Sequence, residues 1–240
     1  MRLERVTITG IDDQVDLGWL DELTFAFPFV EWGVLLSDGR KGKPRYPTDE
    51  WVARLTDMFM PRYDNNFSAH LCGDLCDRLI GDAGQSYLRG ELVPQSRPGF
   101  FSRIQLNSFA DNPKWEFHHI NLLASNLDGN SEIIVPITDE QAMYRVRQAF
   151  HANVNFLHDP SRGQGVPTEN WSNPHTEHFV GFAGGIGPHN VRDVIEMLNA
   201  RDDDRWYWID METNVRTDDQ LDPMKVEEIL KIAASFVSST

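Results

Sequence analysis

Short apolar or alternating runs recur along the chain, and polar segments with helix signals separate them. Runs of four to eight such residues are typical of β-strands, whereas amphipathic segments of ten or more indicate helices. Strands alternating with helices over a chain of 240 residues are typical of a (β/α)8 barrel. The eight runs that we expect to form strands span residues 5–11, 30–36, 67–72, 101–107, 132–137, 153–159, 179–182 and 206–211.

Helix signals fill the gaps between these runs. Thr138 with Gln141 three residues later forms a capping box, and Asp222 followed by Pro223 is an N-cap with proline at the first helical position. We therefore predict a single α/β domain over residues 1–240, with an open doubly wound sheet as the structural alternative. The expected helices span residues 15–23, a segment that begins after Thr48, 75–80, 113–127, 138–150, 168–171, 188–200 and 222–237.

A glycine-rich turn follows the seventh predicted strand. Gly184, Gly185 and Gly187 permit close backbone approach there, and Pro188 suits the first turn of the next helix. Free N–H groups at such a turn stabilise a phosphate dianion without any lysine. The turn therefore predicts a phosphate site, although glycine-rich turns also occur where nothing binds.

Polar residues occupy the face of several strands that would line the barrel lumen. Barrel interiors are mostly branched aliphatic, so these polar groups must either satisfy one another or meet a ligand. We favour a structural network at the strand starts, and a ligand site at the carboxyl ends, where barrel active sites lie. The first set contains Thr7, Ser68, Arg103 and Asn153; the second contains Thr9, Glu31, Cys72, Asn107 and Asp159, with His70 and Gln105 one layer below.

Two adjacent turns resemble those of phosphoribosylanthranilate isomerase, a single-domain (β/α)8 enzyme of tryptophan biosynthesis. The segment AGGIGPHNV at 183–191 is similar to the A-G-G-L-x-P-x-N-V phosphate loop of that family. DMETNVR at 210–216 is similar to its D-V-S-S-G-V-E turn, with threonine for serine and asparagine for glycine. The resemblance implies that Gly184, Gly185, Thr213 and Asn214 bind the phosphate of a phosphoribosyl-type ligand.

Three further segments extend the resemblance along the chain. FLHD at 156–159, followed by GQG and by Trp171, is similar to L-L-D-S…G-G-T-G…D-W, which implies that Asp159 is the general acid that protonates the sugar ring oxygen. Pro44-Arg45-Tyr46 is similar to S-P-R-Y and implies that Arg45 faces a distal carboxylate or other anion. Gln105-Leu106 matches the start of Q-L-H-G, but Asn107 and Ser108 replace its second half.

The first strand departs from the family where its chemistry requires a base. TITGI at 7–11 is similar to K-I-C-G-I, so Thr9 replaces the catalytic cysteine. A thiol with a pKa near 8.5 can remove the C2 proton in an Amadori rearrangement, whereas a threonine hydroxyl does not ionise near neutral pH.

Three interpretations of this replacement remain open. The base has moved to Cys72, Glu31, Asp12 or Asp13; or Asp159 acts with His70 or Cys72 in another phosphosugar isomerisation, epimerisation or lyase step; or the protein binds a phosphorylated ligand without catalysis. Fold cannot choose among them, because function is set by the site.

Composition narrows the choice of partners. The 37 acidic and 22 basic residues leave a formal charge of −15, which disfavours nucleic acid and anionic membranes. No run of 18 apolar residues occurs, so we expect a cytoplasmic protein with neither a membrane span nor a signal peptide. Cys72 and Cys76 are expected to be reduced thiols, and we expect no metal and no cofactor.

Overall fold

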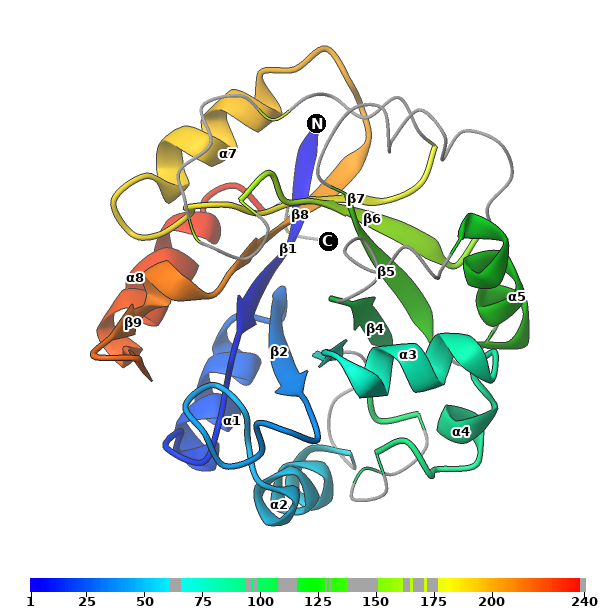
Figure 1. Cartoon of the computed structure of the whole chain (residues 1–240). Helices are drawn as coiled ribbons and strands as arrows, with labels where there is room; N and C mark the ends of the chain where they lie inside the picture. Colours follow the sequence, from blue (N-terminus) through cyan, green and yellow to red (C-terminus); the bar gives the residue numbers. More distant parts are fainter. Residues whose placement is uncertain are drawn as a thin grey trace.

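Eight parallel strands close into a barrel, in which each strand pairs with the next along the chain and β8 pairs with β1 (Figure 1). This arrangement, seen in a computed structural model, confirms the predicted (β/α)8 barrel and excludes the open sheet. The structure describes residues 1–60, 66–93, 96, 99–107, 116–127, 129, 131–137, 151–161, 165, 171 and 177–237. The strands are β1 (Arg2–Thr9), β2 (Val30–Leu36), β3 (Phe67–Leu71), β4 (Arg103–Leu106), β5 (Glu132–Ile137), β6 (Val154–His158), β7 (Val180–Phe182) and β8 (Trp206–Met211).

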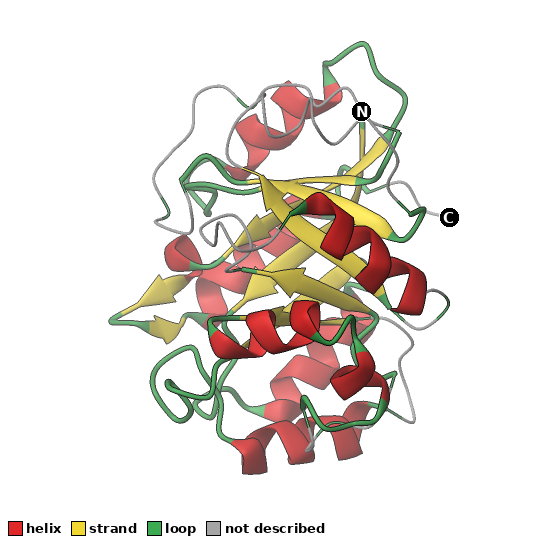
Figure 2. Ribbon diagram, turned by 45° about the vertical axis from the view of Figure 1, so that its right-hand side comes forward, coloured by secondary structure: helices red, strands yellow, loops and turns green. Residues whose placement is uncertain are grey.

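Helices pack around the outside of the barrel, as Figure 2 shows. The N-cap expected at Asp222 is confirmed, because its side chain accepts backbone N–H groups of α8, and the side chain of Thr48 caps α2 in the same way. The helices predicted at 138–150 and 168–171 lie outside the described residues, apart from Trp171. The described helices are α1 (Leu17–Ala26), α2 (Asp49–Phe59), α3 (Asp74–Gly81), α4 (Gln85–Leu88), α5 (Phe117–Leu127), α7 (Val191–Asn199) and α8 (Pro223–Ala233). None of them is long and apolar enough to cross a membrane.

The turn before α7 is longer than the sequence pattern predicts. The helix begins at Val191 with Asn190 as its N-cap, so Pro188 lies in the preceding turn and not in the first helical turn. The side chain of Asn190 accepts the N–H of Gly187 and donates to the carbonyl oxygen of Gly185. These two bonds hold the glycine-rich segment as a separate loop ahead of the helix.

Trp208 is fully buried inside the barrel. Its ring packs with Ile134 and Leu157, and the guanidinium of Arg103 lies 4.1 Å from the ring centroid. Gly181 on the neighbouring strand makes room for this ring, since a Cβ there would lie 2.1 Å from Trp208 Cε2.

Candidate functional site

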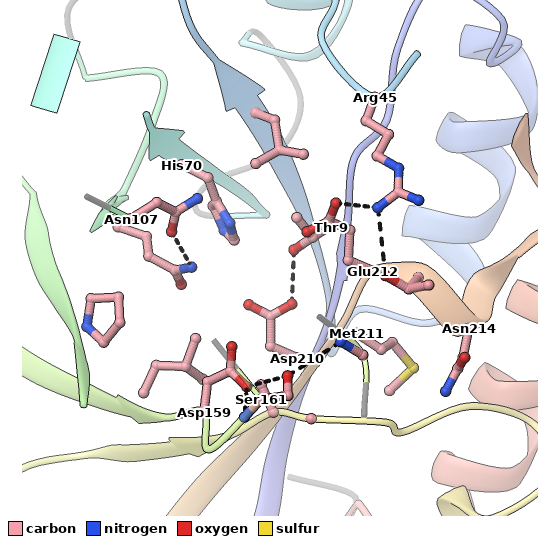
Figure 3. Close-up of a pocket in the computed structure, with 18 of the residues that line it drawn as sticks. Thr9, Arg45, His70, Asn107, Asp159, Ser161, Asp210, Met211, Glu212 and Asn214 are labelled. Carbon is pink, nitrogen blue, oxygen red and sulfur yellow. Dashed lines mark hydrogen bonds and ion pairs between the residues drawn. The ribbon is translucent and has the colours of Figure 1, made fainter. Parts of the chain in front are cut away.

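A cavity of about 520 Å³ opens at the carboxyl ends of the barrel strands. Enzymes with this fold have their active sites at this end. With the exception of Glu31 and of Asp12 and Asp13, the other candidates for a moved base, every residue that the sequence predicts for the site lines the cavity (Figure 3). Those lining residues are Thr9, Arg45, His70, Cys72, Gln105, Asn107, Asp159, Gly184, Gly185, Thr213 and Asn214.

The glycine-rich turn after β7 lies against the turn after β8. Asn214 Nδ2 donates to the carbonyl oxygen of Gly185 at 2.8 Å, so the two predicted phosphate-binding segments are in direct contact. Gly184 and Gly185 have φ values of 110° and 69°, which L-residues with side chains rarely adopt. Within the described residues, the N–H groups of Gly184, Gly185 and Ile186 have no protein acceptor. Three unpaired amides on one turn provide the donors that an anionic oxygen needs.

Asp210, at the end of β8, is the residue that the sequence reasoning missed. It is 5% exposed, lines the cavity and accepts a hydrogen bond of 2.8 Å from Thr9 Oγ1 (Figure 3). Burial raises the pKa of Asp210 to about 8. The negative charges of Glu31, Glu212 and Asp159 also raise this pKa, whereas the hydrogen bond from Thr9 lowers it. Because all of β8 is apolar apart from Asp210, its sequence does not show which face is inward.

Asp159 follows β6 and lines the same cavity. Its Oδ1 atom accepts hydrogen bonds from the N–H of Ser161 at 3.0 Å and from the Ser161 hydroxyl at 2.7 Å. The carboxyl groups of Asp159 and Asp210 therefore differ in environment, since one is bound by a loop serine and the other is buried against Thr9. Such a difference is the usual basis for separate acid and base roles.

His70 and Cys72 lie in the cavity but are poorly suited to proton abstraction. Burial lowers the pKa of His70 to about 4, and its Nε2 atom lies 3.0 Å from the hydroxyl oxygen of Ser68. Burial raises the pKa of the Cys72 thiol, so it stays protonated at neutral pH. A hydrogen bond of 3.4 Å from Asn107 Nδ2 also engages the sulfur atom.

Glu31 does not reach the cavity, which contradicts its prediction as a site residue and relocated base. Its fully buried carboxylate binds Arg5 at 2.9 Å, Arg103 at 3.1 Å and the hydroxyl of Thr7 at 2.9 Å. Burial alone would raise the pKa of Glu31, but Arg103 and Arg5 lower it to about 2. Glu31 is therefore part of the structural network that the sequence predicts for the strand starts.

We expect Glu31→Gln to destabilise the protein by about 3–5 kcal/mol, because it removes the buried carboxylate that pairs with both Arg5 and Arg103 and leaves Arg103 only the half-exposed Glu132. Since the folded pKa lies below the ordinary value of 4.5, the ion pair stabilises the wild type above that pH and is lost as pH falls toward 2. Urea unfolding between pH 7 and pH 2 measures both effects. Glu91→Gln, at an exposed pair with Arg89, is the control; an equal loss in both variants would contradict this role.

Asp12 and Asp13, the other candidates for a moved base, are also engaged elsewhere. Asp12 accepts hydrogen bonds from the backbone of Arg45 and from Arg216 Nη2. Asp13 accepts from the N–H and the hydroxyl of Thr48 at the start of α2. Neither residue lines the large cavity.

Arg45 lies beside the β8 turn and not at the opposite end of the cavity. Its Nη1 atom is 2.7 Å from Glu212 and 3.5 Å from the hydroxyl of Thr213, while Nε is 2.7 Å from Asp219. Burial alone would lower the pKa of Arg45, but these two carboxylates raise it above its ordinary value. The guanidinium thus offsets the charge of Glu212 next to the glycine-rich turn.

The fold and the cavity define a (β/α)8 barrel with a polar site at the carboxyl ends of its strands. No protein-family model matches the sequence, and no curated protein is significantly similar to it. Among solved structures, N-(5'-phosphoribosyl)anthranilate isomerase from Pyrococcus furiosus is similar, with a TM-score of 0.55 and 16% identity over 96% of this chain and 98% of that chain. A native KDPGal structure has a TM-score of 0.53 and 10% identity over 98% and 96%.

A third similar structure is a cube-shaped, porous protein cage designed by fusing symmetric oligomeric domains. Its TM-score is 0.51 and its identity 11%, over 98% of this chain and 73% of that chain. These identities establish the barrel fold and no particular activity. In the described part of the chain, no group of three His, Cys, Asp or Glu residues is arranged to hold a metal ion. Ser108, Gly163 and Gln164 lie outside that part.

Proposed function

We propose that this protein is an acid/base isomerase that acts on a phosphorylated, phosphoribosyl-type small molecule. The observation that supports this best is the hydrogen bond of 2.8 Å between Thr9 and Asp210 in the cavity. Thr9 occupies the position of the cysteine base in the resembling family, and it binds a carboxyl group whose pKa is raised to about 8. An ordinary thiol has a pKa near 8.5, so Asp210 has a proton affinity suited to the same task.

The proposed reaction is the rearrangement of a glycosylamine to an aminoketose. Asp159 protonates the ring oxygen as the bond between it and C1 breaks, and the nitrogen lone pair forms the C=N bond. The Asp210 carboxylate then removes the C2 proton, which leaves an enaminol that tautomerises to the ketone by losing its hydroxyl proton and gaining one at C1. Thr9 holds Asp210 through its hydroxyl and is a positioning residue in this scheme.

The ligand phosphate would bind the free amides of Gly184 and Gly185, with Thr213 and Asn214 beside them. Contact between the two turns supports this placement. The site offers no lysine to form a Schiff base with a substrate, because no lysine is among the described residues that line the cavity. An isomerase therefore fits the described lining better than a lyase that uses a lysine Schiff base.

The alternative is a binding protein for phosphosugars without catalysis, which the loss of the family thiol at Thr9 favours. Glycosylamines formed from ribose 5-phosphate and aromatic amines, including anthranilate, can test both functions in the wild type, Asp159→Asn and Thr9→Cys. We expect conversion by the wild type and a loss of roughly 10²–10⁴-fold in Asp159→Asn, the usual contribution of a general acid. Activity only in Thr9→Cys, with ribose 5-phosphate bound by the wild type, would favour the binding protein.

A further inference from the structure

Three polar side chains form one wall of the cavity at the ends of β3 and β4. Gln105 Nε2 donates to Asn107 Oδ1 at 2.7 Å, and Asn107 Nδ2 donates to Cys72 Sγ at 3.4 Å. The other amide atom, Gln105 Oε1, is buried and receives no hydrogen bond from the described residues. Gln105 as a whole is 5% exposed and lines the cavity.

Exchanging the oxygen and nitrogen positions in the side-chain amides of Gln105 and Asn107 still leaves one atom of Gln105 without a hydrogen-bond partner. The oxygen and nitrogen of a side-chain amide can exchange places with little change in shape. With both amides turned, Asn107 would donate to Gln105 Oε1 and the Cys72 thiol would donate to Asn107. Gln105 Nε2 would then be the unmatched atom, so either orientation leaves one buried polar atom of Gln105 without a protein partner.

This wall is electrically neutral at neutral pH. Burial keeps the Cys72 thiol protonated, because it raises the thiol pKa, and burial lowers the pKa of His70 to about 4, so the imidazole beneath the wall is uncharged. Arg45 is paired with Glu212 and Asp219 on the β8 side. The exposed Arg40 donates to the hydroxyl of Tyr46.

We infer that this wall is a subsite for an uncharged carboxamide group of the ligand. A carboxamide has both N–H and C=O groups, so it can match Gln105 in either orientation, which an unsubstituted aromatic ring cannot do. The inference rests on the proposed function, because a phosphate held after β7 and β8 would direct the rest of the ligand toward β3 and β4. Two strands separate these pairs on each side of the closed barrel, so they face each other across the lumen.

Three stable probes test this subsite, made by reductive amination of ribose 5-phosphate with aniline, 3-aminobenzamide or 3-aminobenzoate. We expect wild-type protein to bind the benzamide probe at least about tenfold more tightly than the aniline probe in calorimetric titrations. Gln105→Met replaces the amide with an apolar chain of similar length and should remove this preference. Its affinity for ribose 5-phosphate should not change, and the exposed Gln85→Met is the matched control.

The outcomes separate this inference from the proposed function. Equal affinities for the aniline and benzamide probes, both competed by inorganic phosphate, would overturn the carboxamide subsite and leave the phosphate site intact. Tightest binding of the benzoate probe would also overturn it, since a charged group would then be preferred. If wild-type protein bound neither the probes nor ribose 5-phosphate, both proposals would fail.

Discussion

Asp210→Asn lowers kcat/KM by roughly 10²–10⁴-fold if Asp210 is the base, since it removes a positioned proton acceptor and preserves its shape. The pH dependence tests the same assignment. Because burial raises the pKa of Asp210 to about 8, wild-type kcat/KM should rise about tenfold per pH unit below that value and level off above it. A rate that falls through pH 8 would make Asp210 the acid and would contradict the proposal.

Thr9→Val separates positioning from proton transfer. The hydroxyl of Thr9 favours the ionised form of Asp210, so its loss should move the midpoint of the pH profile above 8. A purely structural role of Thr9 would lower the rate without moving that midpoint. Asp204→Asn, at a fully exposed aspartate, is the matched control for Asp210→Asn and should leave both rate and profile unchanged.

Stability measurements on Asp210→Asn will show whether misfolding causes any loss of its activity. The folded pKa of Asp210 lies above its ordinary value of 3.8, so the folded protein binds one proton more than the unfolded chain between pH 4 and pH 8. Wild-type stability should therefore fall over this range as pH rises, and this component should be absent in the variant. At pH 8 the variant should be the more stable protein.

Gly185→Asp should weaken the binding of ribose 5-phosphate by at least about a hundredfold. A carboxylate roughly 4 Å from a phosphate costs about 4 kcal/mol at an effective dielectric constant near 20. The positive φ of 69° adds backbone strain, because residues with a side chain rarely adopt it. Calorimetric titration with ribose 5-phosphate, followed by displacement with inorganic phosphate, measures the effect.

Gly39→Asp is the matched control for this substitution. Gly39 is exposed, and a Cβ at that position has no neighbour within 4 Å. Thermal unfolding of both variants verifies that each is folded at the temperature of the titration. Unchanged affinity in a folded Gly185→Asp variant would show that the phosphate binds elsewhere, and the glycine-rich turn would then be only a structural connection.

The barrel could be predicted from sequence because its strands have a strong and repeated signal. The bounds predicted for β2, β5 and β8 agree with the structure, and the other strands differ by one to three residues at their ends. Hydrophobic runs separated by capping residues are local features, so they can be recognised in the sequence without knowledge of the tertiary contacts. The two turns after β7 and β8 could be located for the same reason, since close backbone turns require particular residues at fixed spacing.

The depth of each polar residue in the lumen could not be predicted from a strand pattern. Alternation places Glu31 inside, but only the register of β2 with β1 places its carboxylate beside Thr7. The position of Arg45 beside Thr213 likewise depends on loops that are far apart in sequence.

The sequence by itself therefore determined the barrel, the two adjacent turns and 11 of the 25 described residues that line the cavity, because these follow from local periodicity and turn chemistry. The tertiary structure alone decided which carboxyl group has an unusual proton affinity. Asp210 and Thr9 are 201 residues apart, and only closure of the barrel between β8 and β1 makes them neighbours. A pKa depends on burial and on charges close in space, so it is a property of the folded arrangement and not of the residue order.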